Sequence, residues 1–214
     1  TDGYIYPGLI DLHNHLPYNF LLLWTIHKRF DDRYQWPRLS RYKSEISAPT
    51  KLLANSNAGD LVKYAESKAL VAGVTTIDGY SKFNRSYAAW LLRNVEVSPF
   101  GKSESRIYQS VLRIKNENEF LAVGKKMNKG NAFIYHLAEG TSEELLKEYT
   151  ELETHGLIRD KLVGILCTAL NANNWKILGK NRVKLVWSPL SNLLLYGKTA
   201  YVASAKKNVV LISL

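Results

Sequence analysis

Short apolar runs recur along this chain, and polar or amphipathic segments separate most of them. Leu61, Val62, Ala65 and Ala69 recur at three-to-four-residue spacing, which predicts a helix over residues 60–71. The same spacing predicts helices over residues 116–128 and 142–156, with Asn116 and Ser142 as their caps. Eight apolar runs are predicted as strands: residues 4–15, 74–77, 94–97, 106–114, 132–136, 161–167, 183–187 and 208–214.

Alternation of apolar strands with helices is typical of parallel βα units. Eight such units make a TIM (β/α)8 barrel, so we expect an α/β chain of this kind, with residues 1–214 forming a single domain. The alternative is an open, doubly wound sheet, which in its dinucleotide-binding form carries a glycine-rich loop after the first strand. His13-Asn14-His15 occupies that place here, and this favours the barrel.

Composition narrows the class of protein without naming a function. Hydrophobic residues make up 46% and charged residues 22% of the 214 positions, as in globular rather than disordered chains. No apolar run is long enough to span a bilayer, so no membrane partner is expected. Cys167 is the only cysteine, which excludes an internal disulfide and a cysteine-based zinc cluster and fits a cytoplasmic location.

The formal net charge of +10 raises the question of an anionic partner. The basic residues are dispersed along the chain, and no run reaches the length of a nucleic-acid-binding tail. A basic, solvated surface is therefore favoured over nucleic-acid binding. We expect a small molecule as the principal partner, and a homo-oligomer stays open.

Histidines stand at the ends of two predicted strands. His13 and His15 close the first strand, where alternation would point both side chains to the same face, and His136 closes the strand over residues 132–136. Active sites of barrels lie at the C-terminal ends of their strands. Three imidazoles from two strand ends can hold one divalent metal and leave a position open for water. Imidazole ligands suit zinc, iron and nickel alike, so these residues alone leave the identity of the metal open.

A carboxyl group follows the third histidine. Glu139 comes three residues after His136, where it can carry a proton from the activated water to the leaving nitrogen; the alternative is a surface acid that leads into the next helix. Residues 16–50 form a long aromatic stretch, which is either a functional loop or a partly helical excursion. Tyr18, Trp24 and Trp36 from this stretch are candidates to line a substrate pocket, and the alternative for each is packing in the core. Tyr18 and Trp24 are the two that we predict to bind substrate.

Four motifs, in this order, resemble the amidohydrolase superfamily, in its branch of chlorohydrolases and aminohydrolases. They are Pro-Gly-Leu-Ile-Asp-Leu-His-Asn-His from Pro7, Ala-Gly-Val-Thr-Thr-Ile from Ala72, His-Leu-Ala-Glu-Gly from His136 and Trp-Ser-Pro-Leu-Ser-Asn-Leu from Trp187. The resemblance implies a TIM barrel and hydrolysis of a non-peptide carbon–nitrogen bond, as in a cyclic amide or a heterocyclic amine. It implies one metal, zinc or iron, held by His13, His15 and His136. It adds Ser188 and Asn192 to the predicted substrate-binding residues.

Two departures from the family pattern qualify this expectation. Leu166 stands where the sixth strand of the family carries a metal-site histidine, and Cys167 beside it would face the other way on a strand. The aspartate that follows the last strand in the family does not occur before Leu214, and the family's small β-sandwich is missing. We therefore expect a truncated barrel, incomplete at its C-terminus. It is either a metal-dependent hydrolase or a catalytically impaired fragment with a binding or structural role.

Overall fold

The computed structural model describes residues 3–15, 18–79, 90–96, 107–110 and 112–214. Among these residues every paired strand is parallel to its neighbour, which confirms the predicted α/β class. Two sheets, both in sequential strand order, are formed by β1 (Leu9–Asp11), β2 (Val74–Ile77) and β3 (Arg93–Asn94), and by β4 (Ile107–Ser110), β5 (Ala132–Leu137), β6 (Leu162–Leu166), β7 (Lys184–Val186) and β8 (Leu211–Ser213). Each predicted strand thus has a counterpart; Val97, Arg106 and Val111 lie outside the described residues.

The chain divides into two compact units. Thr1–Trp24 and Ser40–Ser105 make up the first unit, and Thr25–Leu39 and Arg106–Leu214 make up the second. Each sheet belongs to one unit. The segment 25–39 is therefore grouped with residues that follow it by at least 67 positions, rather than with its neighbours in sequence. The expectation of one domain over residues 1–214 stays a prediction.

The first unit joins its three-stranded sheet to a run of helices. These are α1 (Ser40–Tyr42), a π-helical turn (Lys43–Ser47), α2 (Ala48–Ser56) and α3 (Ala58–Val71). The stretch 16–50 is therefore helical from Ser40 onward. Helix α3 buries Leu61, Val62 and Ala65, as its periodicity predicts, and Gly73, with φ of +84°, turns the chain from α3 into β2. A small apolar cluster of Ala65, Ile77 and Leu92 joins the helix to the sheet.

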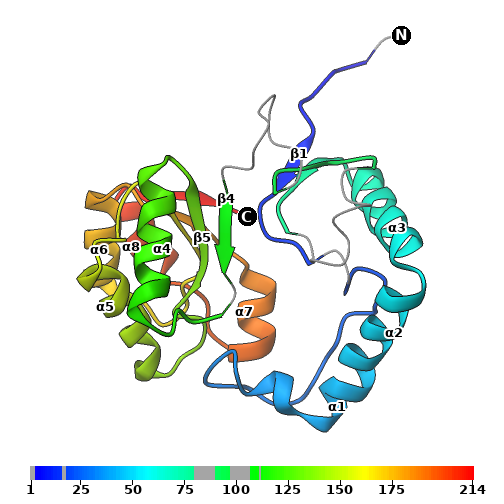
Figure 1. Ribbon diagram of the computed structural model, residues 1–214, viewed down its shortest axis with the longest axis horizontal. Coiled ribbons are helices and arrows are strands. Elements are labelled where there is room, and N and C mark those ends of the chain that lie inside the picture. Colours follow the sequence, from blue (N-terminus) through cyan, green and yellow to red (C-terminus); the bar gives the residue numbers. More distant parts are fainter. Residues whose placement is uncertain (1–2, 16–17, 80–89, 97–106, 111) are drawn as a thin grey trace. The chain divides into compact units, whose positions relative to one another are not determined.

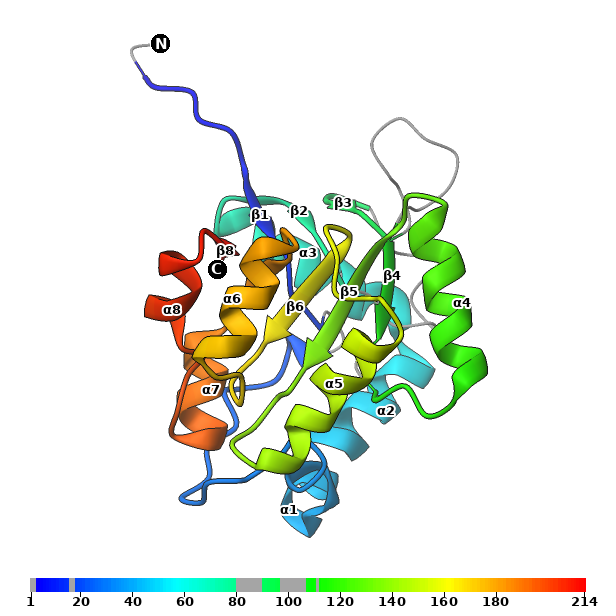
Figure 2. The same cartoon turned by 90° about the vertical axis from the view of Figure 1, so that its left-hand side faces the viewer.

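Among the residues that the structure describes, the second unit carries the larger core. Its helices are α4 (Glu117–Asn128), α5 (Leu146–Thr154) with a 3₁₀ turn before it (Glu143–Leu145), α6 (Ala172–Lys180), α7 (Pro189–Tyr196) and α8 (Val202–Lys207). In Figure 2, α4, α5 and α6 lie over one face of β5 and β6. Phe133, Leu162 and Trp175, each at most 1% exposed, fill the space between helices and sheet. The predicted caps are confirmed, because the side chain of Asn116 accepts the Glu119 N–H and that of Ser142 accepts the Glu144 N–H.

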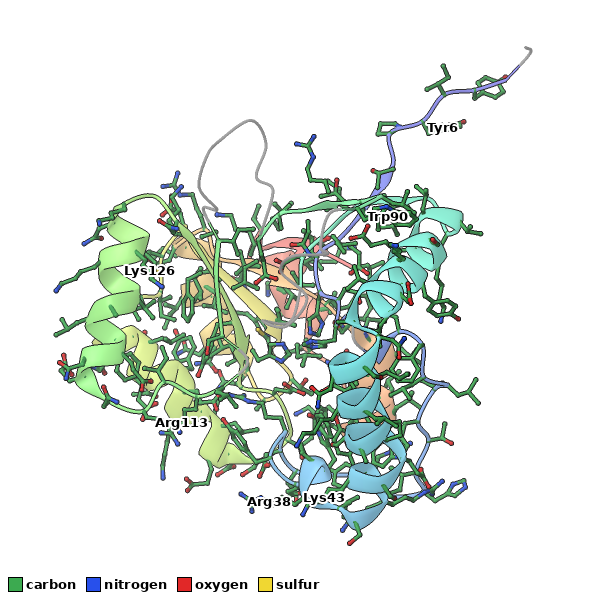
Figure 3. The ribbon with its side chains drawn as sticks, turned by 45° about the vertical axis from the view of Figure 1, so that its right-hand side comes forward. Tyr6, Arg38, Lys43, Trp90, Arg113 and Lys126 are labelled. Atoms are coloured by element: carbon green, nitrogen blue, oxygen red, sulfur yellow. The ribbon has the colours of Figure 1, made fainter. Side chains whose placement is uncertain are left out.

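The first strand is shorter than the predicted residues 4–15. An extended segment runs ahead of β1 (Figure 1), and the exposed Tyr6 lies on it (Figure 3). Only Leu9–Asp11 pairs with β2. The strand ends because the Asp11 carboxylate accepts hydrogen bonds from the His13 backbone N–H and the Asn14 side-chain amide, which folds the chain into a turn. His13 and His15 therefore lie in this turn rather than in the strand, and the strand-alternation argument for them is wrong.

In the part of the chain that the structure describes, no helix is both long and apolar enough to cross a membrane.

Candidate functional site

The turn after β1 brings two imidazoles together. Asp11 Oδ1 accepts the His13 N–H at 3.1 Å, and Asp11 Oδ2 accepts from Asn14 Nδ2 at 2.6 Å. His13 Nε2 then lies 3.2 Å from His15 Nε2, with the ring planes nearly perpendicular at 80°. Asp11 thus supports the turn that carries both histidines through two hydrogen bonds of its carboxylate. Two ring nitrogens that converge in this way can share one cation.

The end of β2 fixes the position of this turn. The Asn14 N–H donates to the Asp78 carbonyl at 3.0 Å, and the Asp78 N–H donates to the Asp11 carbonyl at 2.8 Å. Gly79, with φ of +111°, follows; a Cβ there would lie 1.8 Å from the Asn14 carbonyl oxygen, so only glycine fits. Asp78 itself is fully buried, and burial together with the nearby Glu96 and Asp11 carboxylates raises its pKa to about 7.

Tyr18 and Trp24 occupy different surroundings in the same unit. The Tyr18 ring meets the His15 ring edge-on, with 6.2 Å between centroids and 88° between planes. Trp24 packs edge-on against Tyr42 at 5.4 Å and donates from Nε1 to Glu45 Oε2 at 3.0 Å. Tyr18 thus lies beside the histidine turn, whereas Trp24 packs on the helical excursion. A substrate-binding role for either residue stays a prediction.

In the second unit, a buried histidine and glutamate form a pair at the end of β5. His136 is 3% and Glu139 4% exposed, and Glu139 Oε2 lies 2.8 Å from His136 Nδ1. The backbone reverses between and after them, with Ala138 at φ of +50° and Gly140 at +144°. Burial alone would raise the pKa of Glu139, but hydrogen bonds from His136 and Tyr196 and the charge of Arg33 outweigh it and hold the pKa below its usual value. An ionised carboxylate only accepts, so His136 Nδ1 carries the proton.

A tyrosine that the sequence did not point to binds the other carboxylate oxygen. The Tyr196 hydroxyl, at the end of α7, donates to Glu139 Oε1 at 2.6 Å. Trp36, from the segment 25–39, donates from Nε1 to the Tyr196 oxygen at 3.4 Å. Tyr196 follows Glu139 by 57 positions, and no spacing or motif in the sequence connects the two.

The segment 25–39 also holds the loop that carries Glu139. Arg33 and Glu148 form a buried ion pair, with Arg33 Nη2 2.9 Å from Glu148 Oε1. Glu148 Oε2 accepts the Ala138 N–H at 3.0 Å, and the Asp31 carbonyl accepts the Thr141 N–H at 2.7 Å. These contacts from outside the β5–α5 connection restrict the loop on both sides of Glu139.

Ser188 and Asn192 lie at the start of α7. Ser188 is the N-cap residue, and its carbonyl accepts the Asn192 N–H at 3.1 Å. Asn192 is fully buried, and its side-chain amide donates to Thr199 Oγ1 at 3.4 Å. The Asn192 contacts observed here stabilise the turn after α7. A contact of Ser188 or Asn192 with substrate stays a prediction.

Leu166 contributes no ligand atom at the end of β6. It is 2% exposed and pairs in register with Leu137 of β5. Its φ of +69° and that of Cys167 at +51° are unusual for residues with side chains. Cys167 lies beyond the strand, and a Cβ on Gly164 would come within 2.6 Å of its Sγ, so the thiol folds back over that glycine. Burial raises the pKa of the Cys167 thiol, and this keeps it protonated.

No family model and no curated protein sequence matches the chain. Solved structures do match it over 97% of its length. They include an atrazine chlorohydrolase from Arthrobacter aurescens in complex with zinc and atraton (TM-score 0.72, 10% identity). They also include a guanine deaminase from Bradyrhizobium japonicum (0.67, 19%) and an adenosine deaminase from Xanthomonas campestris with bound zinc (0.65, 14%).

These similar structures are members of the amidohydrolase superfamily. The resemblance seen in the sequence motifs is therefore confirmed at the level of the fold, over nearly the whole chain. The chain spans 58%, 54% and 55%, respectively, of the lengths of these three proteins.

Proposed function

We propose that this chain is the metal-binding part of an amidohydrolase-type enzyme that hydrolyses a non-peptide carbon–nitrogen bond in a small molecule. The observation that carries the proposal is the pairing of chemical groups after two strands, one in each sheet. His13 and His15 converge after β1, and His136 and Glu139 pair at the end of β5. Deaminases and a chlorohydrolase of the same fold, two of them with zinc bound, support this class.

The proposed metal ligands are His13, His15 and His136. The chemistry of these residues fits a divalent ion, because all three are imidazoles and two already converge to 3.2 Å between their Nε2 atoms. His136 Nδ1 faces the Glu139 carboxylate, which is the usual arrangement of a histidine that binds a metal through its other nitrogen. A bound ion would lower the pKa of water and polarise the substrate. Zinc is our first expectation, and iron is the alternative.

Glu139 is the proposed proton carrier. Its pKa is held below the usual value, so the carboxylate is ionised at neutral pH. It can therefore accept a proton from the attacking water. Its burial lets it pass that proton to a leaving nitrogen without exchange with bulk solvent. Tyr18, Trp24, Ser188 and Asn192 remain the proposed substrate-binding residues.

The finer architecture and setting belong to the same proposal. We propose that the eight strands form one (β/α)8 barrel within a single domain over residues 1–214, that the protein is cytoplasmic and that it can form a homo-oligomer. The chain spans 54–58% of the lengths of its structural relatives. A substrate of the non-peptide carbon–nitrogen class is therefore proposed for the chain and is not taken over from those proteins.

Leu166 supports a second candidate function. A buried leucine replaces the histidine that the family motif leads us to expect at the end of β6. It removes both a ligand and a proton carrier from the expected set. A catalytically impaired relative, which binds a small molecule without hydrolysing it, is therefore the alternative.

Metal content tests the proposal most directly. After reconstitution with zinc we expect one ion per chain, measured by mass spectrometry. His15→Gln and His136→Gln should each weaken zinc binding by about tenfold or more. His27→Gln, which changes an exposed histidine outside both pairs, serves as the matched control. Equal zinc binding by all of these variants would contradict the metal site.

Activity separates the two candidate functions. We would assay adenosine, guanine and atraton, together with cyclic amides, at saturating zinc. For the hydrolase, Glu139→Gln should retain zinc but lose about 10²–10⁴-fold in kcat. Zinc binding without turnover of any of these compounds, both in the wild type and in Leu166→His, would favour the non-catalytic alternative.

A further inference from the structure

We infer that Tyr196 is a positioning residue that holds the Glu139 carboxylate in line for proton transfer, through a hydrogen-bond chain that begins at Trp36. The inference rests on the proposed function for the role of Glu139. The hydrogen-bond chain itself rests only on contacts within the second unit. Tyr196 was not among the residues from which the site was predicted, and Trp36 was named only as a candidate to line a substrate pocket.

Both oxygens of Glu139 are bound, each from a different element. His136 Nδ1 lies 2.8 Å from Oε2, and the Tyr196 hydroxyl lies 2.6 Å from Oε1. The histidine contact alone would leave the carboxylate free to rotate about its terminal bond. The second contact removes that freedom, and short hydrogen bonds to an ionised carboxylate are among the strongest in proteins.

The direction of the hydrogen-bond chain is fixed by its first member. An indole N–H can only donate, and Trp36 Nε1 donates to the Tyr196 oxygen at 3.4 Å. The tyrosine proton must then point to Glu139, since an ionised carboxylate can only accept. Burial and the charge of Glu139 raise the pKa of Tyr196, which keeps the hydroxyl protonated. Tyr196 therefore acts as a fixed donor and not as a second proton acceptor.

Separate contacts fix the tyrosine at this place. Gly197 follows it with φ of +66° and ends α7, and a Cβ on this glycine would lie 3.2 Å from Arg29 Nε. The Phe30 N–H donates to the Leu195 carbonyl at 2.9 Å, directly before Tyr196. The last turn of α7 is thus tied to the same segment, 25–39, that supplies Trp36. The segment 25–39 and the end of α7 together hold the Tyr196 hydroxyl against the Glu139 carboxylate.

Tyr196→Phe removes the hydroxyl and keeps the ring. For the zinc-loaded protein we expect kcat to fall about tenfold while KM changes less than twofold, because ground-state binding is untouched. Trp36→Phe should lower kcat by a smaller factor. In a Glu139→Gln background, Tyr196→Phe should have no further effect, because the residue acts only through that carboxylate.

Tyr149→Phe is the matched control. Tyr149 is as buried as Tyr196, at 3% against 5% exposed, and its hydroxyl also donates to a glutamate, Glu153 Oε1 at 3.2 Å. It lies outside the site, and so kcat should stay unchanged. Equal losses of kcat in Tyr149→Phe and Tyr196→Phe, or full activity in Tyr196→Phe, would overturn the inference.

A spectroscopic readout decides the inference even if the protein binds no metal or hydrolyses nothing. The ¹⁵N–¹H signal of His136 Nδ1 reports whether Glu139 is held against the ring. We expect this signal to be visible in the wild type and in Tyr149→Phe, and to broaden or vanish in Tyr196→Phe. An unchanged His136 signal in Tyr196→Phe would contradict the positioning role, whereas loss of metal binding alone would contradict only the proposed function.

Discussion

At the scale of single residues, Gly140 allows the backbone after Glu139 to turn and to approach Asp31 closely. Its φ of +144° is reserved for glycine, and a Cβ would lie 2.2 Å from the Asp31 carbonyl oxygen. We expect Gly140→Ala to lower the free energy of unfolding by about 3 kcal/mol, since backbone strain and a backbone clash add. Gly156→Ala is the control, because Gly156 also has a positive φ, of +66°, but nothing lies within 4 Å of its Cβ. Urea unfolding measures both, and equal losses would contradict the clash.

The buried Arg33–Glu148 pair gives a second prediction at this scale. Both side chains are at most 3% exposed, and Glu148 also accepts the Ala138 N–H. Glu148→Leu would leave the Arg33 charge without its partner carboxylate inside the protein, and we expect a loss of about 3–5 kcal/mol in the free energy of unfolding. Glu144→Gln, which breaks an exposed pair with Lys147, should leave the unfolding midpoint unchanged. A loss below 1 kcal/mol for Glu148→Leu would show that the pair does not fix the loop.

Asp78 gives a pH-dependent prediction. Its pKa is about 7 in the folded protein against an ordinary value of 3.8, so the folded state binds more protons between these two pH values. The stability that Asp78 contributes is therefore fully present below about pH 4 and is lost as pH rises through about 7. Between pH 4 and 8 the free energy of unfolding of Asp78→Asn should rise relative to that of the wild type by about 2–4 kcal/mol. The exposed Asp60→Asn in the same unit should follow the wild-type curve, and parallel curves for Asp78→Asn and wild type would refute the shift.

At the scale of elements, the capping box of α6 is the clearest local determinant. The Asn171 side chain accepts the N–H groups of Asn173 and Asn174, and Asn174 Oδ1 accepts the Asn171 N–H. We expect Asn171→Ala to lower the free energy of unfolding by about 1 kcal/mol, because two N–H groups lose their acceptor. Asn173→Ala, on the exposed first turn, should be neutral or slightly stabilising, because alanine favours helix. Equal effects of the two substitutions on thermal unfolding would argue against the cap.

The elements also show where sequence reasoning succeeds and where it ends. Helix α3 and the caps Asn116 and Ser142 were predictable because periodicity and capping act over a few residues. Helices α6, α7 and α8 were missed, because each is nine residues or shorter and no cap was recognised in front of it. Helix α5 also has nine residues, but Ser142 and the 3₁₀ turn before it extend its pattern.

Contacts that determine the candidate site depend on longer distances along the chain. Glu139 was predicted from its spacing to His136, which is local. Its contact with Tyr196, and the packing of the segment 25–39 against the β5 loop, join parts of the chain separated by many residues. Such contacts follow from tertiary packing and leave no pattern in a single sequence. The same holds for the turn that carries His13 and His15. The apolar run predicts a strand through residue 15, but hydrogen bonds to the Asp11 side chain end the strand earlier.

At the scale of the whole molecule, the described residues of the two units form cores of different size. The first unit closes around Ala65, Ile77 and Leu92, whereas the cluster of the second unit runs from Ile114 to Val210. Local stability follows the amount of buried apolar surface, so we expect the first unit to open at a lower free energy. The segment 25–39 should open with the second unit, although its sequence neighbours belong to the first.

Native-state hydrogen exchange tests this division on the intact chain. The Phe30 and Thr141 amides bind Leu195 and Asp31 carbonyls, so their exchange should share the denaturant dependence of Phe133 in β5. The Leu9 and Asp78 amides, bonded within the first unit, should exchange faster and with a separate dependence. Arg33→Met, which removes the buried charge pair, should speed exchange at Phe30 and Thr141 but leave Leu9 and Asp78 unchanged. One common opening reaction for all five amides would contradict two units, and exchange of Phe30 together with Leu9 would assign the segment to the first.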